Sequence, residues 1–317
     1  MPIGTVQRRP RRTDGALGSL RGILTRHRRA CTVVCSLAVA AALGIILFGR
    51  RHDFSVALER ASIGTLIVAA VLQLVALLAR TEAWHLTIGH AGGTARRRLL
   101  YRASSVGPFG SMLNSQVGAA ARITALRRSC PATTPCVATL VAAEVPIVTI
   151  EAGLAALASF TLIGPLGLPW WLPIPIVGVI GLLAVGVPRL AHRSARPAWR
   201  GLDVLRDLRG ARSVLAFVLV AVVAQIMRNW LLLNAVGVPA TPFDATAVLI
   251  AMVTLSMLPI GPSVGASAVV LILGHDGVAA AAAAGILATA TGTVGGLSFA
   301  GWGAADRLWT GRLAPAA

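Results

Sequence analysis

The sequence has little charge and no lysine. Of its 317 residues, 13% are charged and 56% are apolar, and the mean hydropathy is +0.77. Soluble domains use about a quarter charged residues, so we expect a polytopic membrane protein. Acids are scarce, 11 against 29 arginines, which gives a net charge of +18. The arginines lie in blocks between apolar segments, the positive-inside pattern, so we expect no nucleic-acid partner.

The sequence also lacks the motifs of an enzyme or a metal site. Its four cysteines follow no metal-ligand spacing, and it contains no Gly-rich phosphate loop, nucleophile elbow or zinc motif. A buried cysteine behaves as a small hydrophobic residue, which is the role expected for all four. We therefore expect no enzymatic activity, no cofactor and no metal.

Long apolar runs predict the transmembrane topology. A hydrocarbon core of about 30 Å needs about 20 apolar residues. The runs that meet this length are 31–49, 61–80, 136–163, 170–188, 213–236 and 278–303. They predict six spans in one transmembrane domain, residues 31–306, between an Arg-rich tail at residues 1–30 and a short tail at residues 307–317.

Two further apolar stretches contain residues that break helices. Residues 101–126 include Gly107-Pro108-Phe109-Gly110, and residues 245–273 include Leu258-Pro259-Ile260-Gly261-Pro262-Ser263-Val264-Gly265. Proline removes a backbone donor and clashes with the preceding turn. In hydrocarbon, the freed backbone groups are tolerated only in protein or beside a wet cavity. Because many transporters build their sites from such interrupted helices, the second break indicates a transport-like site.

Loop charges predict the orientation. Residues 1–30 hold eight Arg against one Asp, and residues 189–212 hold seven Arg against two Asp, whereas residues 164–169 have no charge. Both termini are therefore expected in the cytoplasm, in the inner membrane of a bacterial cell. The counts favour an all-α protein with six full transmembrane helices and two re-entrant, broken helical hairpins, one from each face. Such a chain would have two halves in an inverted relation, although an amphipathic or partly spanning pair satisfies many of the same counts.

Two blocks of sequence carry a family resemblance. The first contains Trp84, Gly118 and Arg122, and the second runs from Leu232 to Gly265 through the Pro-rich and Gly-rich break. They resemble the transmembrane, flippase-like region of the lysylphosphatidylglycerol synthase family. Glu144 fits a glutamate of that family, while Ala119 stands where an acid is usual. The resemblance implies a flippase-like protein that handles a lipid or lipid-linked head group, without the soluble catalytic domain of the family's synthases.

Ionisable residues inside the spans are candidate site residues, because each costs about 2.5–3.5 kcal/mol at bilayer depth. Glu144 and Glu151 are seven residues apart, on one face of a helix. Arg228 lies in a polar stripe with Gln225 and Asn229. Glu151 and Arg228 fall at nearly the same depth, which predicts an ion pair. Arg228 is then either a ligand for a lipid phosphate, which its planar fork suits, or part of a helix–helix clamp.

The two breaks supply the remaining candidates. Arg122 follows the first break and is expected either to contact an anionic head group or to anchor the positive inner face. In the second break, the predicted substrate-binding residues are Pro259, Gly261, Ser263 and Gly265. Half-helix N-termini attract anions, but small residues are also ordinary packing in membrane helices.

Together these features predict a flippase-like protein that binds or translocates an anionic lipid or lipid-linked head group. Arg228 and Arg122 would select the head group, and Glu144 and Glu151 would tune or gate them. Two alternatives stay open: a proton-coupled transporter of small solutes, with the two glutamates as proton carriers, and a non-transporting membrane scaffold for a cell-envelope enzyme.

Overall fold

The computed structural model is helical throughout the residues that it describes, which are 51–111, 115–129, 135–193, 208–256, 263–274 and 277–313, with residues 41, 45, 48 and 49. No strand occurs in these ranges. The helices are α2 (Arg51–Arg60), α3 (Ile63–His90), α4 (Arg97–Ser104), α5 (Gly107–Ser111), α6 (Ser115–Ser129), α7 (Val137–Ala158), the 3₁₀ helix η1 (Ser159–Leu162), α8 (Ile163–Leu166), α9 (Pro173–Arg193), α10 (Leu208–Ala235), α11 (Pro242–Leu255), α12 (Val264–Leu273) and α13 (Val278–Leu313).

Four helical segments are long and apolar enough to cross a membrane. They are Ile63–His90, Val137–Leu166, Gly210–Ala235 and Val278–Trp309. Each coincides with one predicted span, so the sequence-based prediction of an all-helical membrane protein is confirmed at this level. The pattern is that of a multi-pass membrane protein.

The other two predicted spans are not among these four segments. Residues 173–188 of the predicted span 170–188 lie in α9, a helix of 21 residues. The span predicted at residues 31–49 lies almost entirely outside the described residues.

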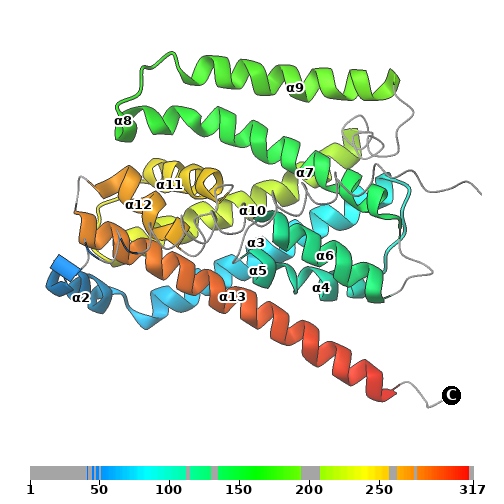
Figure 1. The fold of residues 1–317 in the computed structure, drawn as a ribbon, viewed down its shortest axis with the longest axis horizontal. Coiled ribbons are helices and arrows are strands. Elements are labelled where there is room, and N and C mark those ends of the chain that lie inside the picture. Colours follow the sequence, from blue (N-terminus) through cyan, green and yellow to red (C-terminus); the bar gives the residue numbers. More distant parts are fainter. Residues whose placement is uncertain are drawn as a thin grey trace, which may run out of the picture.

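The centre of the bundle is formed by α3 and α10, which α13 crosses (Figure 1). The two helices are antiparallel: the end of α10 meets the start of α3, where a Cβ at Gly237 would lie 2.7 Å from Nη1 of Arg60. Alanines dominate the contact, with Ala76 and Ala79 of α3 buried against Ala221 and Ala224 of α10. Small side chains allow membrane helices to approach closely, and Leu72 and Phe217 pack against these alanines.

Glycines of α13 allow three other helices to approach it. A Cβ at Gly285 would lie 2.5 Å from the carbonyl oxygen of Gly265 in α12. A Cβ at Gly295 would lie 3.1 Å from the carbonyl oxygen of Ala70 in α3, and one at Gly296 would lie 2.8 Å from Cβ of Pro108 in α5. Any side chain at these positions would force the helices apart. Helix α13 is therefore the element against which the interrupted segments pack.

Both segments with predicted breaks consist of short helices. Residues 245–273 form α11, which ends at Leu255, and α12, which begins at Val264; residues 257–262 between them lie outside the described residues. Residues 101–126 are divided among α4, α5 and α6. Gly107–Gly110 belongs to the short helix α5, because Pro108 stands in its first turn, where no intrahelical partner is needed for the missing N–H.

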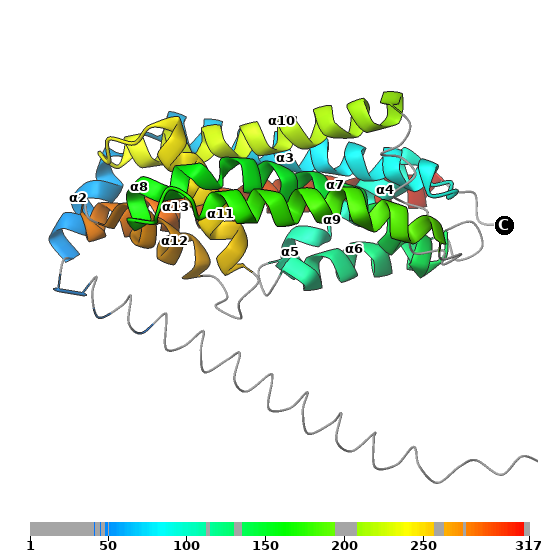
Figure 2. The same ribbon diagram turned by 90° about the horizontal axis from the view of Figure 1, so that it is seen from above.

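The two interrupted segments lie toward opposite ends of the bundle. Figures 1 and 2 place α11 and α12 at the end that holds α2 and α8, and α4 and α6 toward the end where α13 ends. Helix α11 starts with a capping box, in which the Thr241 hydroxyl accepts from the Asp244 N–H and the Asp244 carboxylate accepts from the Thr241 N–H. This cap fixes the point at which the chain turns back toward the bundle.

Candidate functional site

The first polar contact between these helices joins α3 to α7. Arg80 and Glu151 form an ion pair, with 2.9 Å between Nη1 and Oε1, and Arg80 Nη2 also donates to Oε2 at 3.1 Å. The predicted pairing of Glu151 with Arg228 is therefore wrong. Equal depth along two helices does not make them neighbours, and α3 supplies a nearer cation for Glu151.

The second contact joins α6 to α7. Arg122 Nη2 donates to Glu144 Oε1 at 2.5 Å, and both side chains are largely buried, at 11% and 14% exposure. The guanidinium also lies over the Trp84 ring of α3, with 4.7 Å between Cζ and the ring centroid. Trp84 is fully buried. A cation over a buried aromatic face gains further stabilisation, so three helices meet at Arg122.

These four charges form one neutral arrangement, which we call the paired-charge cluster: Arg80, Arg122, Glu144 and Glu151. The seven-residue spacing of the glutamates places them two turns apart on one face of α7. Each receives an arginine from a different helix. The cluster holds two positive and two negative charges, so it contains no unmatched charge.

Arg228 in α10 lies in a different environment. It is 7% exposed and donates through Nη1 to the Gln73 side-chain oxygen and through Nη2 to Asn229 Oδ1, the latter at 3.3 Å. Its Nε is buried and has no hydrogen-bond partner among the described residues. Across the described ranges, no carboxylate lies within ion-pair distance of this guanidinium. We call Arg228, Gln73 and Asn229 the Arg228 site.

Glycines of α13 make room for this site. A Cβ at Gly292 would lie 3.5 Å from Arg228 Nη1, and one at Gly295 would lie 2.9 Å from Gln73 Cγ. The Gln73 side chain therefore fits because Gly295 presents no side chain, whereas the guanidinium is at ordinary van der Waals distance from position 292. This explains why a long polar pair can be buried between α3 and α10.

Met252 links the Arg228 site to the start of α12. Asn229 Nδ2 donates weakly to Met252 Sδ at 3.8 Å, and a Cβ at Gly265 would lie 3.3 Å from Met252 Cε. Ser267, one turn into α12, has a buried hydroxyl without a hydrogen-bond partner among the described residues. Helix α12 therefore begins close to the groups that surround Arg228.

The other predicted site residues have mixed outcomes. Gln225 lies one turn before Arg228 on α10 and is half-buried. Its side chain forms no hydrogen bond within the described part of the chain. Ser263 and Gly265 stand at the start of α12, as the break predicted. Pro259 and Gly261 lie outside the described residues.

Sequence reasoning missed three members of these sites: Gln73, Arg80 and Trp84. Gln73 has a recognisable signal, because it is the one amide side chain in the apolar stretch 63–79. Arg80 is the last residue of the predicted span 61–80, although α3 continues to His90. The helix can continue because Arg80 is neutralised by Glu151, and Glu82 accepts a hydrogen bond from Tyr101 Oη at 2.6 Å.

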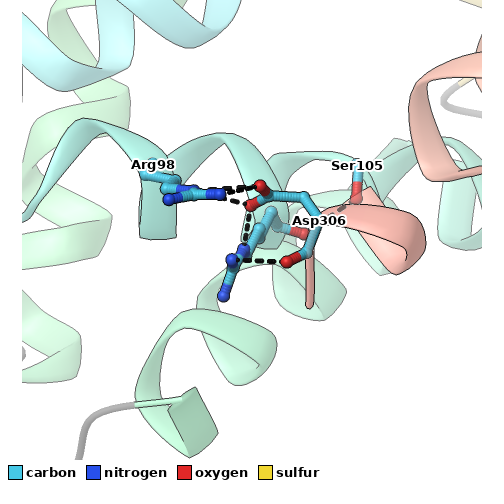
Figure 3. A network of polar contacts seen from close by, with 4 residues as sticks. Arg98, Ser105 and Asp306 are labelled. Atoms are coloured by element: carbon cyan, nitrogen blue, oxygen red, sulfur yellow. Dashed lines mark hydrogen bonds and ion pairs between the residues drawn. The ribbon is translucent and has the colours of Figure 1, made fainter. Parts of the chain in front are cut away.

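A third set of charges has a structural role at the end of α13. Arg98 and Arg102 of α4 both donate to the Asp306 carboxylate, and Arg102 Nη2 donates to the Asp306 backbone oxygen at 2.9 Å (Figure 3). Ser105, in the same view, donates to the Arg102 backbone oxygen at 2.8 Å. The contacts fix α13 to α4. Because Arg98 and Arg102 both bind Asp306, they are not free for a ligand.

The fold and the buried charges define a multi-pass helical membrane protein with two polar sites between its apolar helices. Comparison with protein-family models, curated proteins and solved structures gives no match. The resemblance to the lysylphosphatidylglycerol synthase family therefore rests on the sequence blocks alone. The function is proposed from the Arg228 site.

Proposed function

We propose that this protein is flippase-like and that it binds and translocates an anionic lipid or lipid-linked head group. The observation that carries the proposal is Arg228, a buried guanidinium without an acidic partner in the described ranges. It lies within the candidate span Gly210–Ala235, seven residues or about 10 Å from the end of that span.

An uncompensated charge at this depth requires a reason. Insertion costs about 2.5–3.5 kcal/mol for an arginine near a span centre, and a buried Nε without a partner adds to that cost. A phosphate would satisfy both, because it accepts two parallel hydrogen bonds from one guanidinium. Gln73 and Asn229 would hold the guanidinium in place while no head group is bound.

The paired-charge cluster has a secondary role in this proposal. The charge of Arg122 is already matched by Glu144 at 2.5 Å, so it attracts an anion less than Arg228 does. The cluster joins α6, α7 and α3, and breaking its pairs would loosen these helices together. We assign Arg122, Glu144 and Glu151 to gating and Arg228 to head-group selection.

The proposed topology has six full spans and two re-entrant hairpins, α4–α6 and α11–α12, with both termini in the cytoplasm. Helix lengths support it: α11 has 14 residues, α12 has 10 and α6 has 15. At about 1.5 Å per residue, these helices measure about 15–22 Å, less than the hydrocarbon core of about 30 Å. Each is too short to cross alone.

Translocation can be tested in vesicles. The purified protein is reconstituted with fluorescent phosphatidylglycerol or fluorescent phosphatidylcholine, and the label reaching the outer leaflet is measured by chemical quenching. We expect faster movement of phosphatidylglycerol. The Arg228→Gln variant should lose about tenfold of that rate, because it loses charge-assisted hydrogen bonds.

Two variants control this experiment. Arg96→Gln removes one exposed charge elsewhere and should leave the rate unchanged. Arg228→Lys keeps the charge without the planar fork and should restore part of the rate. Equal rates in wild type and in a folded Arg228→Gln variant would refute the proposal. Movement that instead requires a pH gradient would favour the proton-coupled transporter, and no lipid movement by any variant would favour the scaffold.

A further inference from the structure

A groove lies between α6 and α7, away from the Arg228 site. Its volume is about 560 Å³. Arg127, Arg128 and Thr124 line it from α6, and Val137 and Val141 line it from α7. The proposed function uses none of these residues, so the groove needs its own explanation.

The polar end of the groove carries two unmatched positive charges. Arg127 and Arg128 are both exposed, and neither has an acidic partner within the described ranges. This distinguishes them from Arg98 and Arg102, which share Asp306. An anion at the groove would therefore meet two free guanidinium groups.

The rest of the groove is apolar and follows the membrane-spanning helix. Val137 is the first residue of the candidate span Val137–Leu166, so the arginines stand beside the membrane boundary. Val141 is 45% exposed and Val148, two turns further on, is 51% exposed. An apolar surface thus leads from the arginines into the hydrocarbon region.

We propose that the α6–α7 groove is a binding site for an anionic phospholipid, with its phosphate at Arg127 and Arg128 and an acyl chain along Val137 and Val141. The charge and the apolar wall together select an amphiphile with a negative head, because a zwitterionic lipid carries its own cation beside the phosphate and gains less from the arginines, while a free anion gains nothing from the valines. Binding here does not require translocation and is independent of Arg228.

Cys136 offers a reporter at the mouth of this groove. It is exposed and immediately precedes Val137. Hydrogen bonds with Thr139 hold the pKa of the Cys136 thiol below its usual value, and the charge of Arg127 acts in the same direction. A low thiol pKa favours reaction with maleimide near neutral pH. A lipid head at Arg127 would cover the thiol.

The test measures maleimide labelling of Cys136 in full-length protein carrying C31S, C35S and C130S. The protein is placed in phosphatidylcholine nanodiscs with or without 20 mol% phosphatidylglycerol. We expect phosphatidylglycerol to slow labelling roughly fivefold, because each arginine near the surface attracts an anionic lipid. Inorganic phosphate added to pure phosphatidylcholine discs should give no protection.

The variants separate this site from a general surface-charge effect. R127Q/R128Q should abolish the protection, whereas R96Q/R212Q, which removes two exposed arginines elsewhere, should retain it. The ratio of rates with and without phosphatidylglycerol is compared within each variant, so a change in thiol reactivity cancels. Equal protection in R127Q/R128Q and wild type, or no protection in wild type, would overturn the proposal. If Arg228→Gln abolishes lipid flipping but keeps the protection of Cys136, lipid binding at the α6–α7 groove is supported independently of Arg228.

Discussion

The paired-charge cluster and the Arg228 site both involve α3, but they place arginines under opposite electrostatic conditions. In the cluster, Arg122 and Arg80 each contact a glutamate of α7. At the Arg228 site, amides replace the carboxylates, and Nε has no hydrogen-bond partner in the part of the chain that the structure describes. Amides orient a guanidinium without neutralising it. The difference separates arginines whose charge is matched by a carboxylate from an arginine that we propose binds a lipid head group.

The largest effect is expected from breaking a matched pair. Glu144→Gln leaves Arg122 buried without its counter-charge, which should lower the free energy of unfolding by about 3–5 kcal/mol. Detergent-induced unfolding in mixed micelles measures this change. The double variant Arg122→Met, Glu144→Gln should recover most of the loss, and failure to recover would show that the pair does not act as a unit.

Removing the unmatched charge of Arg228 should instead raise the free energy of unfolding. In the absence of anionic lipid, Arg228→Met should raise the free energy of unfolding by about 2–3 kcal/mol, because the insertion cost of the arginine disappears. The same unfolding assay applies. A large loss of stability in this variant would mean that Arg228 is a structural clamp and would erase the distinction between the two sites.

The glycine packing between α12 and α13 gives a third test. Gly285→Ala places a methyl group 2.5 Å from the Gly265 carbonyl oxygen and should lower the free energy of unfolding by about 2 kcal/mol. Gly301→Ala is the matched control in the same helix, because nothing lies within 4 Å of a Cβ there. Equal stabilities of the two variants would show that α12 does not approach α13 closely.

The smallest effect is expected at the more exposed pair. Arg80 and Glu151 side chains are 37% and 28% exposed, and ion pairs open to solvent contribute little. Arg80→Gln should lower the free energy of unfolding by about 1 kcal/mol or less. A loss as large as that of Glu144→Gln would place Arg80 in the same buried environment as Arg122.

The sequence predicts the helices better than it predicts their neighbours. The length of the apolar runs locates α3, α7, α10 and α13, because a helix that crosses a bilayer needs a long run of apolar residues. Proline and glycine locate the interruption between Leu255 and Val264. The extension of α3 to His90 escapes this reasoning, since it depends on partners from α4 and α7 that satisfy Glu82 and Arg80.

The partners of the buried polar residues are also not predicted by the sequence. Arg228 is recognisable because a charge inside a long apolar helix is rare. Its neighbour Gln73 lies 155 residues away along the chain, and nothing in local periodicity joins the two. The choice of Arg80 over Arg228 as the partner of Glu151 is likewise made by lateral packing, which depth along a helix does not specify. Helix content and depth are local properties, whereas partners are set by the assembled bundle.

The most direct measurement is the stabilisation of the protein by an anionic lipid, in a R127Q/R128Q background that removes the α6–α7 groove. The melting temperature is compared in micelles with phosphatidylglycerol and with phosphatidylcholine. If Arg228 binds the head group, phosphatidylglycerol raises the melting temperature by about 3 °C or more, and Arg228→Met abolishes the difference. The same rise in the presence and absence of Arg228 would contradict the account.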